Sequence, residues 1–253
     1  MPLPVQRTGN PSLNERIFAN QPRPAFGEAR MTLQGTINKS FLLLVVLLAG
    51  ALWTWSQYLT TGDLSVVSSS VMIGSIGGLI LAFVMAFKPN LAPYLAIPYA
   101  GLEGLALGGL SAVFEVRSHG IAMQAVGLTF AVFAVMLVAY KFGIIRATER
   151  FRAIVIGATG AIALFYLVSM VLSLFHVGVP ILNSSSPLGI GLSLVIVGVA
   201  ALNLILDFDF IESGASYGAP RYMEWYGAFS LLVTLVWLYL EILRLLGNMR
   251  RND

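Results

Sequence analysis

The chain has 253 residues, of which 57% are apolar and 11% are charged, and it contains no cysteine. Because a soluble domain carries about 25% charged residues, this chain is expected to be an integral membrane protein. The absence of cysteine excludes disulfides, thiolate metal sites and cysteine nucleophiles. The net charge of +3 does not indicate a nucleic-acid partner, because the basic residues are separated by long apolar runs.

Residues 1–39 precede the first apolar run and contain five prolines and five basic residues. This composition predicts a mostly disordered leader. It does not resemble a secretory signal, because the apolar run begins too late and no cleavage-like site follows it.

The rest of the chain is dominated by long apolar stretches. A membrane helix needs about 20 mostly apolar residues and must satisfy its own backbone hydrogen bonds. Seven stretches meet this requirement, at residues 40–59, 66–87, 91–114, 121–140, 153–175, 187–206 and 225–246. We therefore predict an all-α, seven-helix transmembrane domain over residues 40–247, followed by a short basic tail at 248–253.

The lysines and arginines indicate how these spans are oriented, because cytoplasmic loops are rich in both. With the amino terminus inside, eleven of the fifteen basic residues lie on the inner side and four on the outer side. Three of those four are Arg244, Arg250 and Arg251, near the end of the chain. Either the carboxyl terminus lies outside, or the acidic segment after the sixth span is re-entrant and both termini lie inside.

Two predicted spans contain glycine pairs at a spacing of four residues, Gly74 with Gly78 and Gly104 with Gly108. Such pairs allow two membrane helices to approach closely. Glu103 lies beside the second pair, near the middle of the third span. A charged side chain at that depth costs about 2.5–3.5 kcal/mol on insertion scales. Glu103 is therefore either a protonated side chain in a tight helix contact or part of a proton or cation site.

The densest group of acidic residues, Asp207, Asp209 and Glu212, follows the sixth span. If the helix continues, Asn203 and Asp207 share one face, while Asp209 and Glu212 lie together on another. Adjacent carboxylates raise one another's proton affinity, so this group favours a cation, a shared proton or a basic partner. The alternative is an ordinary helix end in the headgroup region.

The last span contains Glu241 and Arg244, three residues apart, a spacing that allows an intrahelical ion pair. Thr234 lies on the same stripe as Glu241, seven residues earlier. No Walker loop, dinucleotide fingerprint, HExxH or GxSxG motif is present in the sequence. We therefore expect neither an enzyme nor a resident cofactor.

Three segments together resemble the Bax inhibitor family, in its bacterial YccA-like branch. They are GLEGLALGG at 101–109, NLILDFDFIE at 203–212 and EWYGAFSLLVTLVWLYLEILRLLG at 224–247. The resemblance covers roughly residues 31–247. It implies a seven-helix bundle in which the last helix is central and wrapped by the other six.

The resemblance also implies a function. Characterised members are pH-sensitive calcium leak channels with two sensor aspartates, one at the end of the sixth span and one in the seventh. The first falls on Asp207 or Asp209, of which Asp207 is favoured. At the second position this chain has Thr234, and the second span lacks the family's arginine. Glu241 could substitute for the aspartate, or Thr234 could supply a neutral oxygen.

Our leading hypothesis is a cation leak pathway of the bacterial inner membrane, most plausibly for Ca²⁺, gated by carboxylate protonation. Ca²⁺ takes oxygen ligands; Asp207 and Asp209 are its candidate ligands, with Glu103, Thr234 and Glu241 as further pathway or sensor residues. No metal site is firmly assigned. The alternative is a non-conducting regulator that binds a membrane-anchored quality-control protease through the leader.

Overall fold

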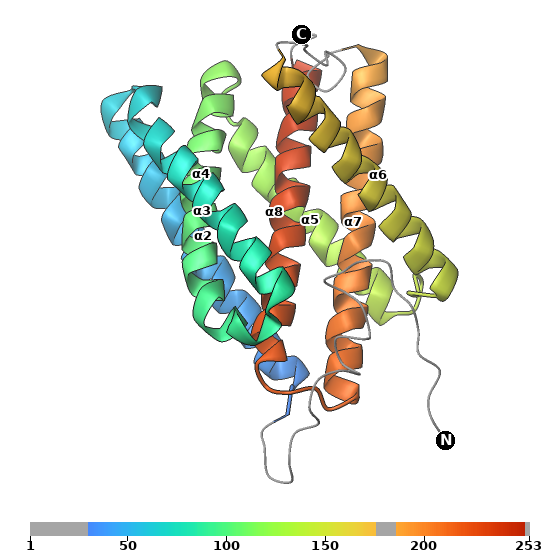
Figure 1. Ribbon diagram of the computed structural model, residues 1–253. Helices are drawn as coiled ribbons and strands as arrows, with labels where there is room; N and C mark the ends of the chain where they lie inside the picture. The colour runs from blue at the N-terminus through green and yellow to red at the C-terminus, as the bar shows by residue number, and fades with distance from the viewer. Residues whose placement is uncertain (1–29, 176–185, 251–253) are drawn as a thin grey trace. The chain divides into compact units, whose positions relative to one another are not determined.

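The computed structural model describes residues 30–175 and 186–250, most of which are helical (Figure 1). The elements are α2 (Leu33–Thr61), α3 (Leu64–Phe87), a short 3-10 turn η1 (Pro89–Leu91), α4 (Ala92–Arg117), α5 (Ile121–Lys141), α6 (Glu149–Leu174), α7 (Pro187–Ser216) and α8 (Met223–Arg250). Seven spans among the described residues are long and apolar enough to cross a membrane. The predicted all-α, seven-helix fold is confirmed.

The helices extend beyond both predicted ends of the transmembrane domain, which we had placed at residues 40 and 247. Helix α2 begins at Leu33, because Thr32 caps it by accepting a hydrogen bond from the Gly35 N–H. Residues 33–39, which we assigned to the leader, are therefore helical. Helix α8 continues to Arg250, so the first residues of the predicted tail are also helical. The leader up to residue 29 lies outside the described residues.

Helix α7 is longer than predicted, because it continues beyond residue 206 to Ser216. The acidic segment 207–212 is thus part of one continuous helix of 30 residues, about 45 Å long. A helix therefore occupies the positions for which we considered a re-entrant segment, while the side of the membrane on which the carboxyl terminus lies stays a prediction. The hydropathy pattern located only the end of the apolar run. The helix ends later, because its backbone hydrogen bonds continue to Ser216.

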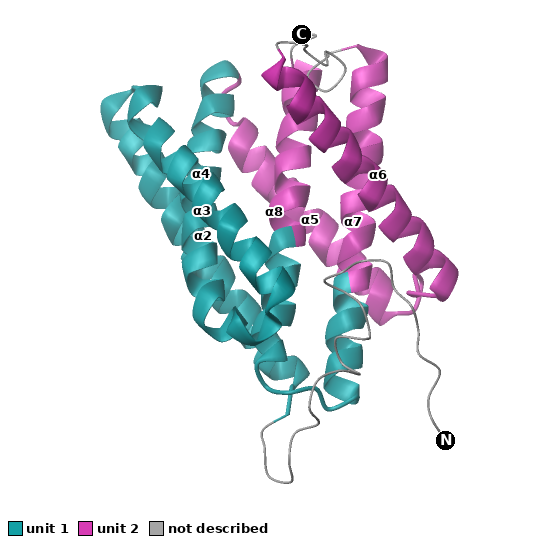
Figure 2. Ribbon diagram, viewed as in Figure 1, with its two compact units in different colours: residues 1–117, 207–233 teal, residues 118–206, 234–253 magenta. Residues whose placement is uncertain are grey.

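The chain divides into two compact units, shown in Figure 2. Unit 1 comprises residues 1–117 and 207–233, and unit 2 comprises 118–206 and 234–253. The boundaries fall inside α7, after Leu206, and inside α8, after Val233. Each of these helices therefore contributes one part to each unit.

In unit 1, α4 packs closely against both α2 and α3. A Cβ atom added at Gly104 or Gly108 would lie 2.2 or 2.3 Å from a backbone oxygen of α2. A Cβ added at Gly74 would lie 2.4 Å from the Leu102 oxygen of α4. Gly74, Gly104 and Gly108 therefore lie at helix contacts where a larger residue would force the backbones apart.

In unit 2, polar side chains join helices that are otherwise apolar. The Asn203 amide of α7 donates to Thr159 Oγ1 of α6 at 2.8 Å. The Asn248 amide of α8 donates to Ser193 Oγ of α7 at 3.4 Å. Near the end of α8, Arg250 donates to the His119 carbonyl and to Gln124. These bonds connect α8 to the start of unit 2.

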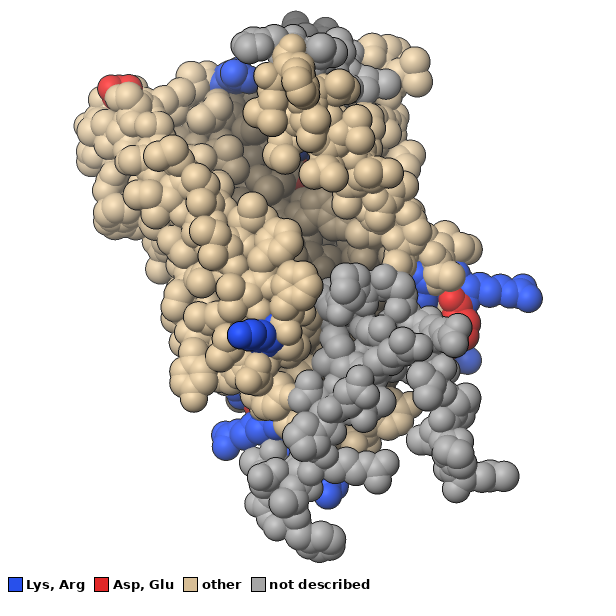
Figure 3. All heavy atoms as spheres, in the orientation of Figure 1, with Lys and Arg blue, Asp and Glu red and all other residues tan. Residues whose placement is uncertain are grey.

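The spans differ strongly in the buried share of their apolar 18-residue segment. The share is largest for α8, at 56%, and smallest for α6, at 6%. Uncharged side chains cover most of the helical surface in view in Figure 3. Because lipid accepts apolar side chains, this exposed surface fits a membrane environment.

Candidate functional site

Asp207 is the most buried of the acids on α7, with 2% of its surface exposed. Its Oδ1 accepts a hydrogen bond of 2.8 Å from the Ser230 hydroxyl of α8, within unit 1. Asn203, one turn earlier, is also buried, as predicted for two residues on one helix face. The last two helices are thus joined at Asp207 by a bond to a titratable group.

The other two acids of this segment are more accessible than Asp207. Asp209 is half-buried and Glu212 is exposed. Among the described residues, no group of three or more histidine and carboxylate side chains is arranged to hold a metal ion. A Ca²⁺ site at Asp207 and Asp209 would therefore need backbone, hydroxyl or water oxygens as further ligands.

Glu103 lies in unit 1, where α4 faces α3. Its carboxyl is hydrogen-bonded to Tyr99, four residues earlier on α4. A Cβ atom added at Gly78 of α3 would lie 2.9 Å from Glu103 Oε1, so that glycine leaves room for the carboxyl. The Tyr99 ring packs edge-on against Phe229 of α8, with 5.0 Å between ring centroids. Glu103 thus lies in a tight helix contact.

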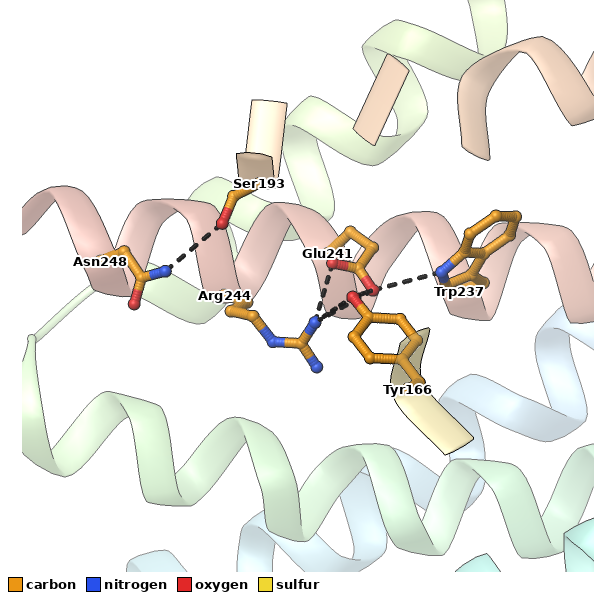
Figure 4. A network of polar contacts seen from close by, with 6 residues as sticks. All are labelled: Tyr166, Ser193, Trp237, Glu241, Arg244 and Asn248. Atoms are coloured by element: carbon orange, nitrogen blue, oxygen red, sulfur yellow. Dashed lines mark hydrogen bonds and ion pairs between the residues drawn. The ribbon is translucent and has the colours of Figure 1, made fainter. Parts of the chain in front are cut away.

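Glu241 is bound by a network of polar side chains in unit 2, shown in Figure 4. The carboxylate is 2% exposed. Its Oε1 accepts from the Tyr166 hydroxyl of α6 at 2.7 Å and from Trp237 Nε1 at 3.2 Å. Arg244 Nη1 lies 3.0 Å from Oε2, which confirms the predicted intrahelical pair. The Arg244 guanidinium also lies 5.2 Å from the Tyr166 ring centroid.

The groups that compensate the charge of Glu241 come from its own helix, α8, and from α6. An ion pair with further hydrogen bonds is the arrangement that tolerates a carboxylate away from water. Thr234, seven residues earlier on α8, is also buried. The predicted site residues divide between the units: Glu103, Asp207 and Asp209 belong to unit 1, and Thr234 and Glu241 to unit 2.

A second buried carboxylate on α8, Glu224, was not among the predicted site residues. It is 3% exposed, and its Oε1 accepts from both the backbone N–H and the hydroxyl of Thr32, each at 2.9 Å. Lys39 of α2 forms an ion pair with its Oε2. The Lys39 ammonium also lies 5.4 Å from the Trp225 ring centroid. We call Thr32, Lys39, Glu224 and Trp225 the α2–α8 clamp.

The sequence contained a signal for this clamp. Lys39 was assigned to the leader, yet it lies directly before an apolar run that begins at residue 40. A charge at such a position requires a partner of opposite sign or access to water. Glu224 occupies the equivalent position before the last span. Lys39 and Glu224 are 185 positions apart. No spacing within one helix relates them, so the sequence did not show that they form a pair.

The part of the chain that the structure describes forms seven membrane-length apolar helices, with carboxylates buried on the last two. These features define a multi-span helical membrane protein. The chain belongs to the Bax inhibitor 1-like family, whose model matches residues 10–251. No curated protein and no solved structure shows significant similarity to it. The family resemblance seen in the sequence is thereby confirmed.

Proposed function

We propose that this protein is a leak pathway for Ca²⁺ in which protonation of Asp207 favours opening. It acts as a transport protein and not as an enzyme. The observation that carries the proposal is the hydrogen bond from the Ser230 hydroxyl to Asp207 Oδ1, at 2.8 Å, between the last two helices. Membership of the Bax inhibitor 1-like family supports it.

The chemistry of that bond gives it a pH dependence. A hydrogen bond to an ionised carboxylate is roughly twice as strong as one between neutral groups. Protonating Asp207 removes the charge and weakens the bond to Ser230, so the population shifts toward arrangements in which α7 and α8 separate. Opening is therefore favoured at low pH and closure at high pH.

Oxygen-rich side chains along the last two helices suit a hard cation. Asp207 and Asp209, both in unit 1, would provide charge. Glu241, in unit 2, is not proposed as a ligand, because Arg244 and Tyr166 already occupy its oxygens. Glu103 would act as a further protonation site in unit 1.

We propose a bacterial inner-membrane location with the amino terminus in the cytoplasm. The distribution of lysine and arginine supports this orientation, with eleven residues inside and four outside. With seven spans the two termini would lie on opposite sides of the membrane, so the carboxyl terminus would face outward. Labelling single engineered cysteines at residues 10 and 252 in intact cells tests this arrangement, because the chain has no cysteine of its own.

The test of function is calcium flux from liposomes that contain the purified protein. Wild-type flux should rise as the pH falls. Asp207→Asn, which mimics the uncharged carboxyl, should give high flux that no longer varies with pH. Ser230→Ala, which removes the donor, should shift the flux curve toward higher pH.

Glu212→Gln is the matched control, because Glu212 lies on the same helix but is exposed. It should leave the pH curve unchanged. Wild-type flux no greater than that of empty liposomes would overturn the proposal and favour a non-conducting regulator. An unchanged pH response in Asp207→Asn would overturn the assignment of the sensor.

A further inference from the structure

The start of α2 is attached to the link between α7 and α8 by its backbone as well as by the α2–α8 clamp. The Met31 N–H donates to the Ala219 carbonyl at 2.8 Å, and Arg30 and Pro220 form an antiparallel bridge. Gly218 adopts a left-handed conformation with φ of 68°, which permits the turn of the link. Main-chain and side-chain contacts thus lie together at one end of unit 1.

The clamp is built for a carboxylate at position 224. Thr32 caps the amino terminus of α2, where unpaired N–H groups and the helix dipole favour a negative charge. A Cβ atom added at Gly35 would lie 2.2 Å from Glu224 Oε1, so only glycine leaves room for the carboxylate. Lys39, one turn beyond Gly35 on α2, supplies the counter-charge. Three separate features of α2 therefore receive Glu224.

The clamp also determines where the rest of α8 begins. Ser230 lies six residues after Glu224 on the same helix, which is about 9 Å along its axis. A shift or rotation of the first turn of α8 would move Ser230 relative to Asp207. It would also break a part-buried ion pair and leave the buried Glu224 carboxylate without its counter-charge, which is unfavourable.

We propose that the α2–α8 clamp is a lock that holds α8 in the closed arrangement, with Glu224 as the positioning residue for the Ser230–Asp207 bond. This inference rests on the proposed leak function and adds its regulation. The contact between α2 and α8 must open before α7 and α8 separate. Any partner that displaces the start of α2 would therefore favour the open state.

Calcium flux from liposomes tests the lock. Glu224→Gln and Lys39→Met should each raise flux at neutral pH by about tenfold, since hydrogen bonds to charged groups contribute roughly that factor. The midpoint of the flux curve should move to higher pH, because a weaker lock needs less protonation of Asp207. Lys39→Arg keeps the charge and should restore near-wild-type flux.

Lys88→Met is the matched control for the lysine, because Lys88 is exposed at the end of α3. It should leave both flux and midpoint unchanged. Folded Glu224→Gln and Lys39→Met proteins with the flux and midpoint of wild type would overturn the lock. A merely structural role would lower the yield or thermal stability without moving the midpoint.

A crosslink between α2 and α8 tests the lock by holding the contact closed. A Cβ atom added at Gly227 would lie 3.4 Å from Thr36 Cγ2, which places Thr36→Cys and Gly227→Cys within reach of a disulfide. The oxidised pair should abolish flux at every pH, and reduction should restore it. If oxidised protein still conducts at low pH, the lock is wrong.

The rate of crosslinking separates the lock from the leak function. Adding Glu224→Gln to the cysteine pair should slow disulfide formation severalfold, because α2 and α8 would spend less time in contact. If wild type shows no flux but the rate falls as expected, the leak function fails while the clamp holds α8. An unchanged rate overturns the clamp even where flux is present.

Discussion

Helix α8 carries two buried carboxylates that are compensated in different ways. Glu224, in its first turn, is bound by Thr32 and Lys39 of α2. Glu241, toward the other end, is paired with Arg244 of its own helix. The first arrangement ties two distant segments together, whereas the second chiefly neutralises a charge where it lies. Similar burial therefore does not imply a similar role, because the position of the cation decides what the pair holds in place.

The largest effect is expected from removing the cation of the intrahelical pair. Arg244→Met would leave Glu241 buried with an uncompensated charge, which should lower the free energy of unfolding by about 3 kcal/mol. Thermal unfolding in detergent measures this loss. Adding Glu241→Gln should recover much of it, because the buried charge is then gone. A double variant less stable than Arg244→Met would contradict this account of the pair.

A smaller loss of stability is expected for the interhelical pair. In Lys39→Met, Glu224 keeps both hydrogen bonds from Thr32 at the amino terminus of α2. The helix dipole there still partly compensates its charge, which it does not do for Glu241, so the free energy of unfolding should fall by only about 2 kcal/mol. Unlike Arg244→Met, this change should also raise calcium flux at neutral pH. Measuring stability and flux on the same preparations sharpens the contrast. Equal flux changes in the two variants would mean that the pairs do not differ in role.

Tyr166 tests how far the Glu241 network depends on α6. Tyr166→Phe removes the hydroxyl that donates to Glu241 Oε1 but keeps the ring beside Arg244. The free energy of unfolding should fall by only about 1 kcal/mol, because Arg244 and Trp237 still bind the carboxylate. Phe165→Leu, at the neighbouring position, controls for general disturbance of α6. A loss as large as that of Arg244→Met would show that α6 is essential to the compensation.

The smallest effect is expected at an exposed carboxylate. Hydrogen bonds from the Ser65 hydroxyl and backbone N–H lower the pKa of Asp63, which caps α3. A lowered pKa in the folded state means that the cap contributes fully at neutral pH. Its contribution is lost as the pH falls through that lowered value. Asp63→Ala should thus slightly lower the thermal midpoint at pH 7 but not in strong acid. An equal decrease at both pH values would contradict the capping role.

The sequence was sufficient to predict the number and nature of the spans. In a hydrocarbon environment the backbone must satisfy its own hydrogen bonds, so an apolar run of membrane length specifies a helix by itself. The intrahelical pair of Glu241 and Arg244 was predictable for the same reason, because helix periodicity relates residues three apart. Hydropathy failed at Leu33 and Ser216, where helices continue outside the apolar run.

Only the tertiary structure decided which polar groups meet. Glu224 and Lys39 are 185 residues apart, and Ser230 reaches Asp207 from another helix. Periodicity relates residues within one helix, but it says nothing about which helix faces them. The sequence by itself therefore determined seven apolar helices and a short set of candidate acids. The packing of α2, α7 and α8 assigned partners to them, because buried charges are stabilised by whichever groups the fold brings within hydrogen-bond distance.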